Sequence, residues 1–424
     1  MNEAFFNKFI TLILNIKRKG FFHLLSANFL INLFGFGSQL FVAKFLSSTD
    51  LGRIKTMQSF ISLAVIIGGF GLNTAVLKLC SENKSLDEKK LILKENLKFS
   101  FIGTFVVIII MAWLALRGYL SPDVAINRWM LLFMFSIPSA IFTSLFICYI
   151  QALKKIQVMA YAQIAIRSFG VISLIIFTYF WQLPGFILSS VLFGLIALIP
   201  LFRLTEINWK GEQARSDIWK QSFYYGKWSV ACNGLNAFGV SIGIFLLNYL
   251  VKDREILGDY GLAMIFILAL NQVTGTVQAI ATPFFSEKHN NKSEFVRVLK
   301  KYQKLLIILA GSIAFLAILI VPLLIKLAYP GKYQMAGVFF QILAIRYFFW
   351  SCYALLGVAL IGLGQMKANF IASSINVLFA VFLTVSFIRL WGPIGVAYAQ
   401  ALSGLVATGV SIVIFKKAFR KCFA

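Results

Sequence analysis

Very few side chains in this sequence could do acid–base, redox or metal chemistry. Among its 424 residues there are only two histidines, His23 and His289, which are too few for an imidazole relay or a typical zinc site. The five cysteines include no CxxC pair, so they predict neither a disulfide framework nor a metal centre. We therefore expect no cofactor and no bound metal.

Two arginines are the most unusual polar residues. Arg167 and Arg346 each lie about ten residues inside a long apolar run, which is ~15 Å along a helix and too deep for easy contact with a membrane surface. We expect no Asp or Glu in the interior of such a run; the nearest is Asp259, in the first turn of a helix predicted at 257–284. Each arginine therefore either binds backbone carbonyls and water or faces a hydrated cavity that takes an anion.

The elements that carry these arginines are predicted to be transmembrane helices. Sixty per cent of the residues are apolar, against ~45–50% in soluble domains, and they form runs of about 20 residues that match a ~30 Å hydrocarbon layer. The sequence thus predicts an all-α polytopic membrane protein. About twelve helices are expected, at 21–46, 52–79, 99–118, 127–152, 157–182, 185–204, 223–251, 257–284, 303–328, 335–363, 366–389 and 393–416.

The basic residues predict the orientation of these helices. Of the lysines and arginines near the connections, 26 fall on the side of the N-terminus and nine on the other side. Positively charged loops stay in the cytoplasm, so both termini should be cytoplasmic. The same loops explain the net charge of +25, and no nucleic-acid partner is expected. Residues 1–20 predict an amphipathic helix on the cytoplasmic surface rather than a signal peptide.

An internal repeat divides the chain. Asn-Leu-Phe-Gly at 32–35 recurs as Asn-Ala-Phe-Gly at 236–239, and Leu-Gly at 51–52 recurs at 257–258, with offsets of 204 and 206. Six helices per half give both halves the same orientation, as in transporters built from parallel repeats. The expected organisation is a six-helix half at 21–204, a cytoplasmic linker at 205–222, a second six-helix half at 223–416 and a cytoplasmic tail at 417–424.

The stretch 43–78 resembles the start of polysaccharide-transporter flippases, including O-antigen flippases. Those proteins begin with a helix that ends in a basic residue and Leu, a short loop that leads to Gly, and a second helix with Gly-Leu near its end. Lys44, Leu46, Gly52, Gly71 and Leu72 stand at those positions.

Two later segments are similar to the same family. They are the pattern with Gly362, Lys367 and Asn376, and the Gly-Pro-Ile-Gly opening of the last helix at 392–395. The resemblance implies the twelve-helix architecture shared with multidrug and toxin extruders and lipid II flippases. The major facilitator superfamily also has six plus six helices, but its Gly-x-x-x-Asp-Arg/Lys-x-Gly-Arg/Lys loop is missing from the loop after the second helix here.

The function that this resemblance implies is lipid flipping. The substrate would be an undecaprenyl-diphosphate-linked oligosaccharide, an O-antigen or similar unit, moved from the cytoplasmic to the outer leaflet of a bacterial inner membrane by alternating access. Membrane lipids and polysaccharide polymerase machinery would be the partners. A multidrug-type exporter should carry a deep Asp or Glu, and a membrane-embedded polysaccharide enzyme needs acids, bases or long outer loops. The sequence predicts neither, so it favours a transporter that is not an enzyme.

The candidate substrate ligands are basic and amide side chains within the predicted spans. Lysines near span ends can equally well reach lipid headgroups, and amides that suit sugar hydroxyls can equally well join helices. Trp350 and Tyr353, four and seven residues after Arg346, could hold its guanidinium, offer a surface for sugar stacking, or simply pack. The candidates are Arg167, Arg346, Lys44, Lys78, Lys227, Asn32, Asn236, Gln58, Asn271 and Gln272.

Overall fold

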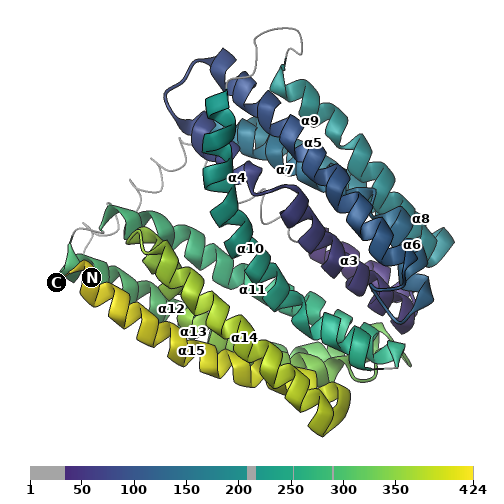
Figure 1. Ribbon diagram of the computed structural model, residues 1–424. Coiled ribbons are helices and arrows are strands. Elements are labelled where there is room, and N and C mark those ends of the chain that lie inside the picture. The colour runs from purple at the N-terminus through teal and green to yellow at the C-terminus, as the bar shows by residue number, and fades with distance from the viewer. Residues whose placement is uncertain (1–33, 208–215, 252, 289–290, 424) are drawn as a thin grey trace, which may run out of the picture. The chain divides into compact units, whose positions relative to one another are not determined.

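The computed structural model describes residues 34–207, 216–251, 253–288 and 291–423, and within these ranges the chain is almost entirely helical with no strand. The all-α prediction is therefore confirmed (Figure 1). The predicted amphipathic helix at 1–20 lies outside these ranges. Residues 34–45 are helical, and the elements that follow are α3 (Ser48–Gly68), α4 (Leu72–Ser81), α5 (Leu86–Leu116), α6 (Val124–Phe133), α7 (Ser136–Ala152), α8 (Ile156–Ile196), α9 (Leu198–Thr205), α10 (Ser216–Leu250), α11 (Arg254–Glu287), α12 (Lys292–Ala328), α13 (Ala336–Gly362), α14 (Met366–Trp391), the 3₁₀ helix η1 (Gly392–Ile394) and α15 (Gly395–Cys422).

These helices account for eleven of the twelve predicted membrane spans, whereas most of the first, at 21–46, lies outside the described residues. Seven stretches of the described residues are long and apolar enough to cross a bilayer, or nine when the bent pairs α3–α4 and α6–α7 each count as one span. Two of the seven, 49 and 57 residues long, each cover two predicted spans. The first of them is interrupted at Gln182, which has φ 47° and precedes Pro184, where the sequence predicts a very short turn. The protein is therefore a multi-pass membrane protein.

Several helices begin well before the apolar run that predicts them. α5 starts at Leu86 rather than near 99 because Ser85 forms a capping box: its Oγ accepts the Glu88 N–H at 3.2 Å, and its own N–H donates to Glu88 at 3.1 Å. α12 starts at Lys292 rather than near 303, since the Asn291 side chain accepts the Glu294 N–H at 3.2 Å. Hydropathy marks the membrane-embedded part of a helix, and the cap marks its beginning.

The chain forms two compact units. One unit consists of residues up to Val42 together with Ala64–Arg117 and Arg128–Ala231. Within it α7 packs against α4, α5, α8 and α9. The α3–α4 break lies here, with Phe70 and Gly71 in the left-handed region and the helices bent by 47°. Gly71 is needed because an added Cβ would lie 2.5 Å from the carbonyl oxygen of Gly226 on α10.

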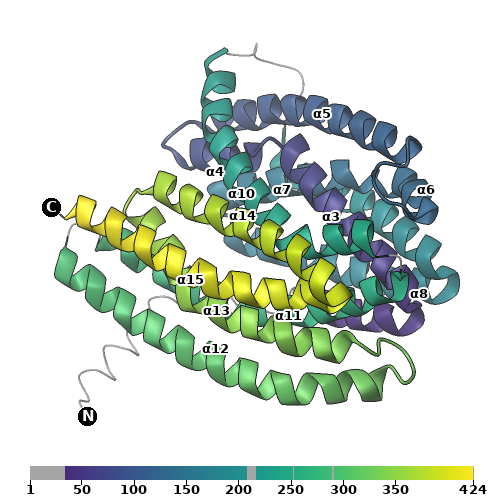
Figure 2. The ribbon, with the colours of Figure 1, turned by 60° about the horizontal axis from the view of Figure 1, so that its bottom comes forward.

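The other unit consists of Ala43–Leu63, Gly118–Asn127 and Cys232–Ala424. Within it α13 packs against α11, α12 and α15, and α14 packs along α15, as both ribbon views show (Figures 1 and 2). Phe285, Phe295, Leu306, Leu355 and other buried side chains from four of these helices form its apolar core. These two spatial units have other boundaries than the predicted sequential halves at 21–204 and 223–416, and the division into halves remains a prediction.

Candidate substrate-binding cavity

A cavity of about 480 Å³ lies inside the unit that contains most of the C-terminal half. Five helices line it: α10, α11, α13, α14 and α15. Its walls combine amides, hydroxyls and aromatic rings with small apolar residues. The polar and aromatic lining residues are Asn236, Asn271, Gln278, Arg346, Tyr347, Trp350, Tyr353, Asn369, Ser373, Asn376, Ser403 and Ser411.

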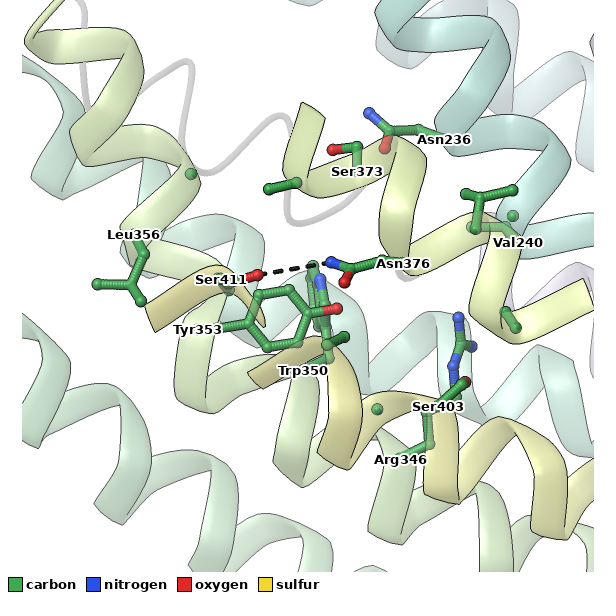
Figure 3. A pocket seen from close by; sticks show the side chains of 18 of the residues that line it. Asn236, Val240, Arg346, Trp350, Tyr353, Leu356, Ser373, Asn376, Ser403 and Ser411 are labelled. Atoms are coloured by element: carbon green, nitrogen blue, oxygen red, sulfur yellow. Dashed lines mark hydrogen bonds between the residues drawn. The ribbon is translucent and has the colours of Figure 1, made fainter. Parts of the chain in front are cut away.

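One face of α13 supplies the charge and the rings. Arg346, Trp350, Tyr353 and Gly357 follow one another at spacings of four, three and four, which is one stripe of a helix, and all four line the cavity. Figure 3 shows the guanidinium of Arg346 at one end of this stripe and the rings of Trp350 and Tyr353 beyond it. Arg346, Trp350 and Tyr353 therefore share one face of α13 that borders the cavity.

Another part of the wall comes from α14 and α15. Asn369, Ser373 and Asn376 lie at spacings of four and three on α14, and Ser403 and Ser411 face the cavity from α15. The Nδ2 of Asn376 donates to Ser411 Oγ at 3.5 Å, the bond drawn in Figure 3. These groups can both donate and accept hydrogen bonds, as the hydroxyls of a sugar require.

Arg346 is the single charged residue among those that line the cavity. No ion pair or cation–π contact involves it among the described residues, and its side chain is half-buried. Gly404 on α15 packs beside its stem, where an added Cβ would make an ordinary contact of 3.4 Å with Arg346 Cγ. A guanidinium without a carboxylate beside it attracts an anion strongly in a low-dielectric environment.

A buried carboxylate holds the N-terminal end of α13. Asp259 is 5% exposed, and its Oδ2 accepts the N–H of Met335, the residue that caps α13, at 3.0 Å. It lies in the second turn of α11 rather than in the first, because Asp253 caps the helix by accepting the Glu255 N–H at 2.9 Å and α11 therefore begins at Arg254. Asp259 thus has a structural partner and lies outside the cavity lining.

Of the predicted ligands, the structure brings Arg346, Asn236 and Asn271 together on this cavity. Gln58, Gln272 and Lys44 belong to the same unit but are not among its lining residues. Lys44 is exposed, and its carbonyl oxygen accepts a hydrogen bond from Lys332 Nζ at 3.3 Å.

The remaining predicted ligands belong to the other unit or to parts that the structure does not describe. Arg167 is exposed on α8. Lys78 lies 3.9 Å from Glu82, and Lys227 lies 5.1 Å from the centroid of the Tyr224 ring. Asn32 lies outside the described residues. The role of each as a ligand remains a prediction.

The ligands predicted from the sequence include no residue of α14 or α15. The stripe of Asn369, Ser373 and Asn376 in an otherwise apolar helix was a usable signal, because polar residues at helical spacing mark a cavity or a helix contact. Ser403 and Ser411 gave a weaker signal, since serines are common where membrane helices pack closely.

Comparison with known proteins identifies the family. Residues 18–289 match the family described as Polysaccharide biosynthesis protein, which is more than half of the chain. The chain belongs to the polysaccharide biosynthesis protein family. No curated protein matches this family member by sequence.

Solved structures share the fold of this polysaccharide biosynthesis family member. An inward-facing multidrug resistance MATE transporter of the MOP superfamily matches with a TM-score of 0.76 at 12% identity, over 92% of this chain and 95% of its own. The lipid II flippase MurJ, in an inward closed conformation, matches with 0.74 at 17%, over 94% and 89%. The Vibrio cholerae MATE transporter VcmN matches with 0.66 at 12%, over 96% and 98%. The chain therefore shares the polytopic membrane fold of MATE transporters and MurJ, as the sequence predicts.

Proposed function

We propose that this protein flips an undecaprenyl-diphosphate-linked oligosaccharide, an O-antigen or similar repeat unit, from the cytoplasmic to the outer leaflet of a bacterial inner membrane. The observation that carries the proposal is the composition of the cavity wall. Among the described residues, this wall combines one unpaired guanidinium with amides, hydroxyls and aromatic rings, and it includes no carboxylate. Family membership and the fold shared with a lipid II flippase support the same proposal.

The substrate fits these groups chemically. A diphosphate or an acidic sugar carries negative charge that Arg346 can bind with two parallel hydrogen bonds. The hydroxyls of a glycan can exchange hydrogen bonds with Asn376, Asn369 and Ser411, and sugar rings can stack on Trp350. The polyprenyl tail is as apolar as lipid and would stay in the bilayer. Transport would proceed by alternating access, with both termini in the cytoplasm.

A multidrug exporter is the main alternative, because MATE transporters share the fold. An exporter of cationic drugs needs an acid in its binding site for the drug or for a coupling ion. The described residues that line this cavity include none. A membrane-embedded polysaccharide enzyme needs acid–base groups, and the cavity wall has no carboxylate pair and no histidine.

The other basic and amide residues predicted as ligands would bind the substrate elsewhere on its way across the membrane. Arg167, Lys78 and Lys227 would meet anionic groups of the substrate in the first unit, and Lys44 would do so in the second. The amides of Asn32, Gln58 and Gln272 would join Asn236 and Asn271 in binding sugar hydroxyls. Polysaccharide polymerase machinery would be the partner that uses the flipped unit.

The test is a comparison of surface glycan between a deletion strain and strains rescued with variants. Wild-type protein should restore the glycan, and Arg346→Ala should restore much less at equal membrane level. The matched control is Arg389→Ala, which removes an exposed arginine from the last turn of α14, outside the cavity. Unchanged surface glycan in the deletion strain, with altered resistance to cationic drugs, would contradict the proposal.

A further inference from the structure

The middle of α13 receives hydrogen bonds from a glutamine on the neighbouring helix α12. The Nε2 of Gln303 donates to the carbonyl oxygens of Ser351 at 3.2 Å and Cys352 at 3.0 Å. Carbonyls in a helix interior are already bonded within the helix, so these donors are additional. Gln303 is half-buried and does not line the cavity.

Two further helices bind the same turn of α13. The Nε2 of Gln278 on α11 donates to the carbonyl of Ala354 at 2.9 Å. The Oγ1 of Thr408 on α15 lies within hydrogen-bond distance of two carbonyl oxygens that share its one proton, that of Phe349 at 3.1 Å and that of Gly404 on its own helix at 2.9 Å. The segment from Phe349 to Ala354 is thus held by side chains of three neighbouring helices, and it lies within the stripe that runs from Arg346 to Gly357.

The bonded carbonyls surround the cavity face of the helix. At about 100° per residue, Trp350 and Tyr353 lie within about 40° of Arg346 on the helix circumference. Ser351 and Cys352 lie about 140° away on one side and about 120° away on the other, so Gln303 binds α13 from behind. By the same count Ala354 and Phe349 lie on the two flanks, about 80° and about 60° from Arg346.

We infer that Gln303 is a positioning residue for the cavity: it fixes the rotation of α13 so that Arg346, Trp350 and Tyr353 face the cavity. The inference rests on the proposed function in that this cavity is taken as the substrate site. Gln303 itself touches no substrate. Gln303 acts through the α13 backbone, and Gln278 holds the same backbone from one flank.

The amide is not explained by ordinary packing. A leucine or methionine would fill the same volume at this position, which lies between Lys301 and Lys304 where the apolar run of α12 begins, and a buried polar group is costly unless its hydrogen bonds are made. The Oε1 of Gln303 is buried and has no partner among the described residues, so the residue keeps part of that cost. What the amide adds is its two donors, both of which are used on α13.

The experiment compares the thiol reactivity of two adjacent positions on α13. The first reporter is native Cys352, kept as the single cysteine of the full chain, and the second is Tyr353→Cys in a chain without other cysteines. A charged thiosulfonate reagent should label position 353 from the cavity much faster than position 352. In Gln303→Met the ratio of the two rates should fall by about three- to eightfold, the shift expected from losing one or two membrane hydrogen bonds of average strength.

Gln400→Met is the matched control. It removes a buried glutamine of the same unit whose Nε2 donates at 3.4 Å to Thr384 and which therefore joins α15 to α14 rather than to α13. Its labelling ratio should stay that of the parent, while Gln278→Met should lower the ratio less than Gln303→Met does.

Three outcomes would overturn the inference. They are an unchanged ratio in Gln303→Met, an equal fall in Gln400→Met, or the loss of Gln303→Met from the membrane while Gln400→Met inserts normally, which would make Gln303 a folding residue. Because labelling needs no substrate, failure of this test is distinguishable from failure of the flipping assay.

Discussion

Replacing Gly258 by alanine should destabilise the protein, because two glycines of the internal repeat meet in space. Gly52 on α3 and Gly258 on α11 occupy equivalent positions of the repeat, and both belong to the second unit. A Cβ added at Gly258 would lie 2.5 Å from the carbonyl carbon and 3.0 Å from the Cα of Ser48, and it would overlap the carbonyl oxygen. These are backbone atoms, which cannot rotate away as the end of a flexible side chain can.

The magnitude follows from the space required. Ordinary contacts with a Cβ begin at 3.4 Å, so α3 and α11 must separate by about 0.9 Å to relieve the carbon contact alone. Overpacking of this kind typically costs about 1–3 kcal/mol, and rigid backbone on both sides points to the upper end. The higher helix propensity of alanine relative to glycine offsets up to about 1 kcal/mol of this cost. The free energy of unfolding should therefore fall by about 2 kcal/mol.

The assay is thermal unfolding of the purified protein in detergent, with Gly275→Ala as the control. Gly275 lies on the same helix, and an added Cβ there would meet nothing within 4 Å. Gly275→Ala should match or exceed the wild-type unfolding temperature, while Gly258→Ala should fall clearly below it. Equal stability of the two variants would refute the close crossing of α3 and α11.

Three more predictions concern topology, the second arginine and energy. Reporter fusions after Lys90 or Lys292 should be cytoplasmic and those near Asp253 external; an inverted half would contradict the parallel repeat. Arg167→Ala should reduce surface glycan at normal membrane level, and full activity would remove Arg167 from the proposed ligands. An inside-negative membrane potential should support flipping without an ion gradient, because moving two negative charges outward gains up to roughly 5 kcal/mol per 100 mV. A proteoliposome assay with a potassium diffusion potential measures this, and transport that follows only a proton or sodium gradient would count against it.

Much of the helical architecture could be predicted because the membrane constrains it. The span predicted at 366–389 is observed as α14, Met366–Trp391, and the span at 335–363 as α13, Ala336–Gly362. A hydrocarbon layer needs helices of known length, and apolar runs report that length directly. The helix starts at Leu86 and Lys292 were not predicted because they lie in polar sequence, where a single cap such as Ser85 decides the boundary.

Part of the site could be predicted from the sequence, since Arg346, Asn236 and Asn271 are predicted ligands that line the cavity. Arg346 stood out because a charge deep in a membrane is costly, and in the structure it lines the cavity. Asn376 and Ser403 did not stand out, because the same residue types also join helices. The contacts of Gln303 depend on which helix lies beside α12, and hydropathy carries no such information.

The most direct test of the central claim is transport of purified undecaprenyl-diphosphate-linked oligosaccharide in proteoliposomes. Wild-type protein should move the lipid to the opposite leaflet, and Arg346→Ala should slow this by about tenfold or more, since a hydrogen bond to a charged group contributes about 1.5–3 kcal/mol. Arg346→Lys should restore only part of the rate, because lysine lacks the planar fork, and Arg389→Ala should behave as wild type. Wild-type protein that leaves the lipid in place, or an Arg346→Ala variant that flips it at the full rate, would contradict the account.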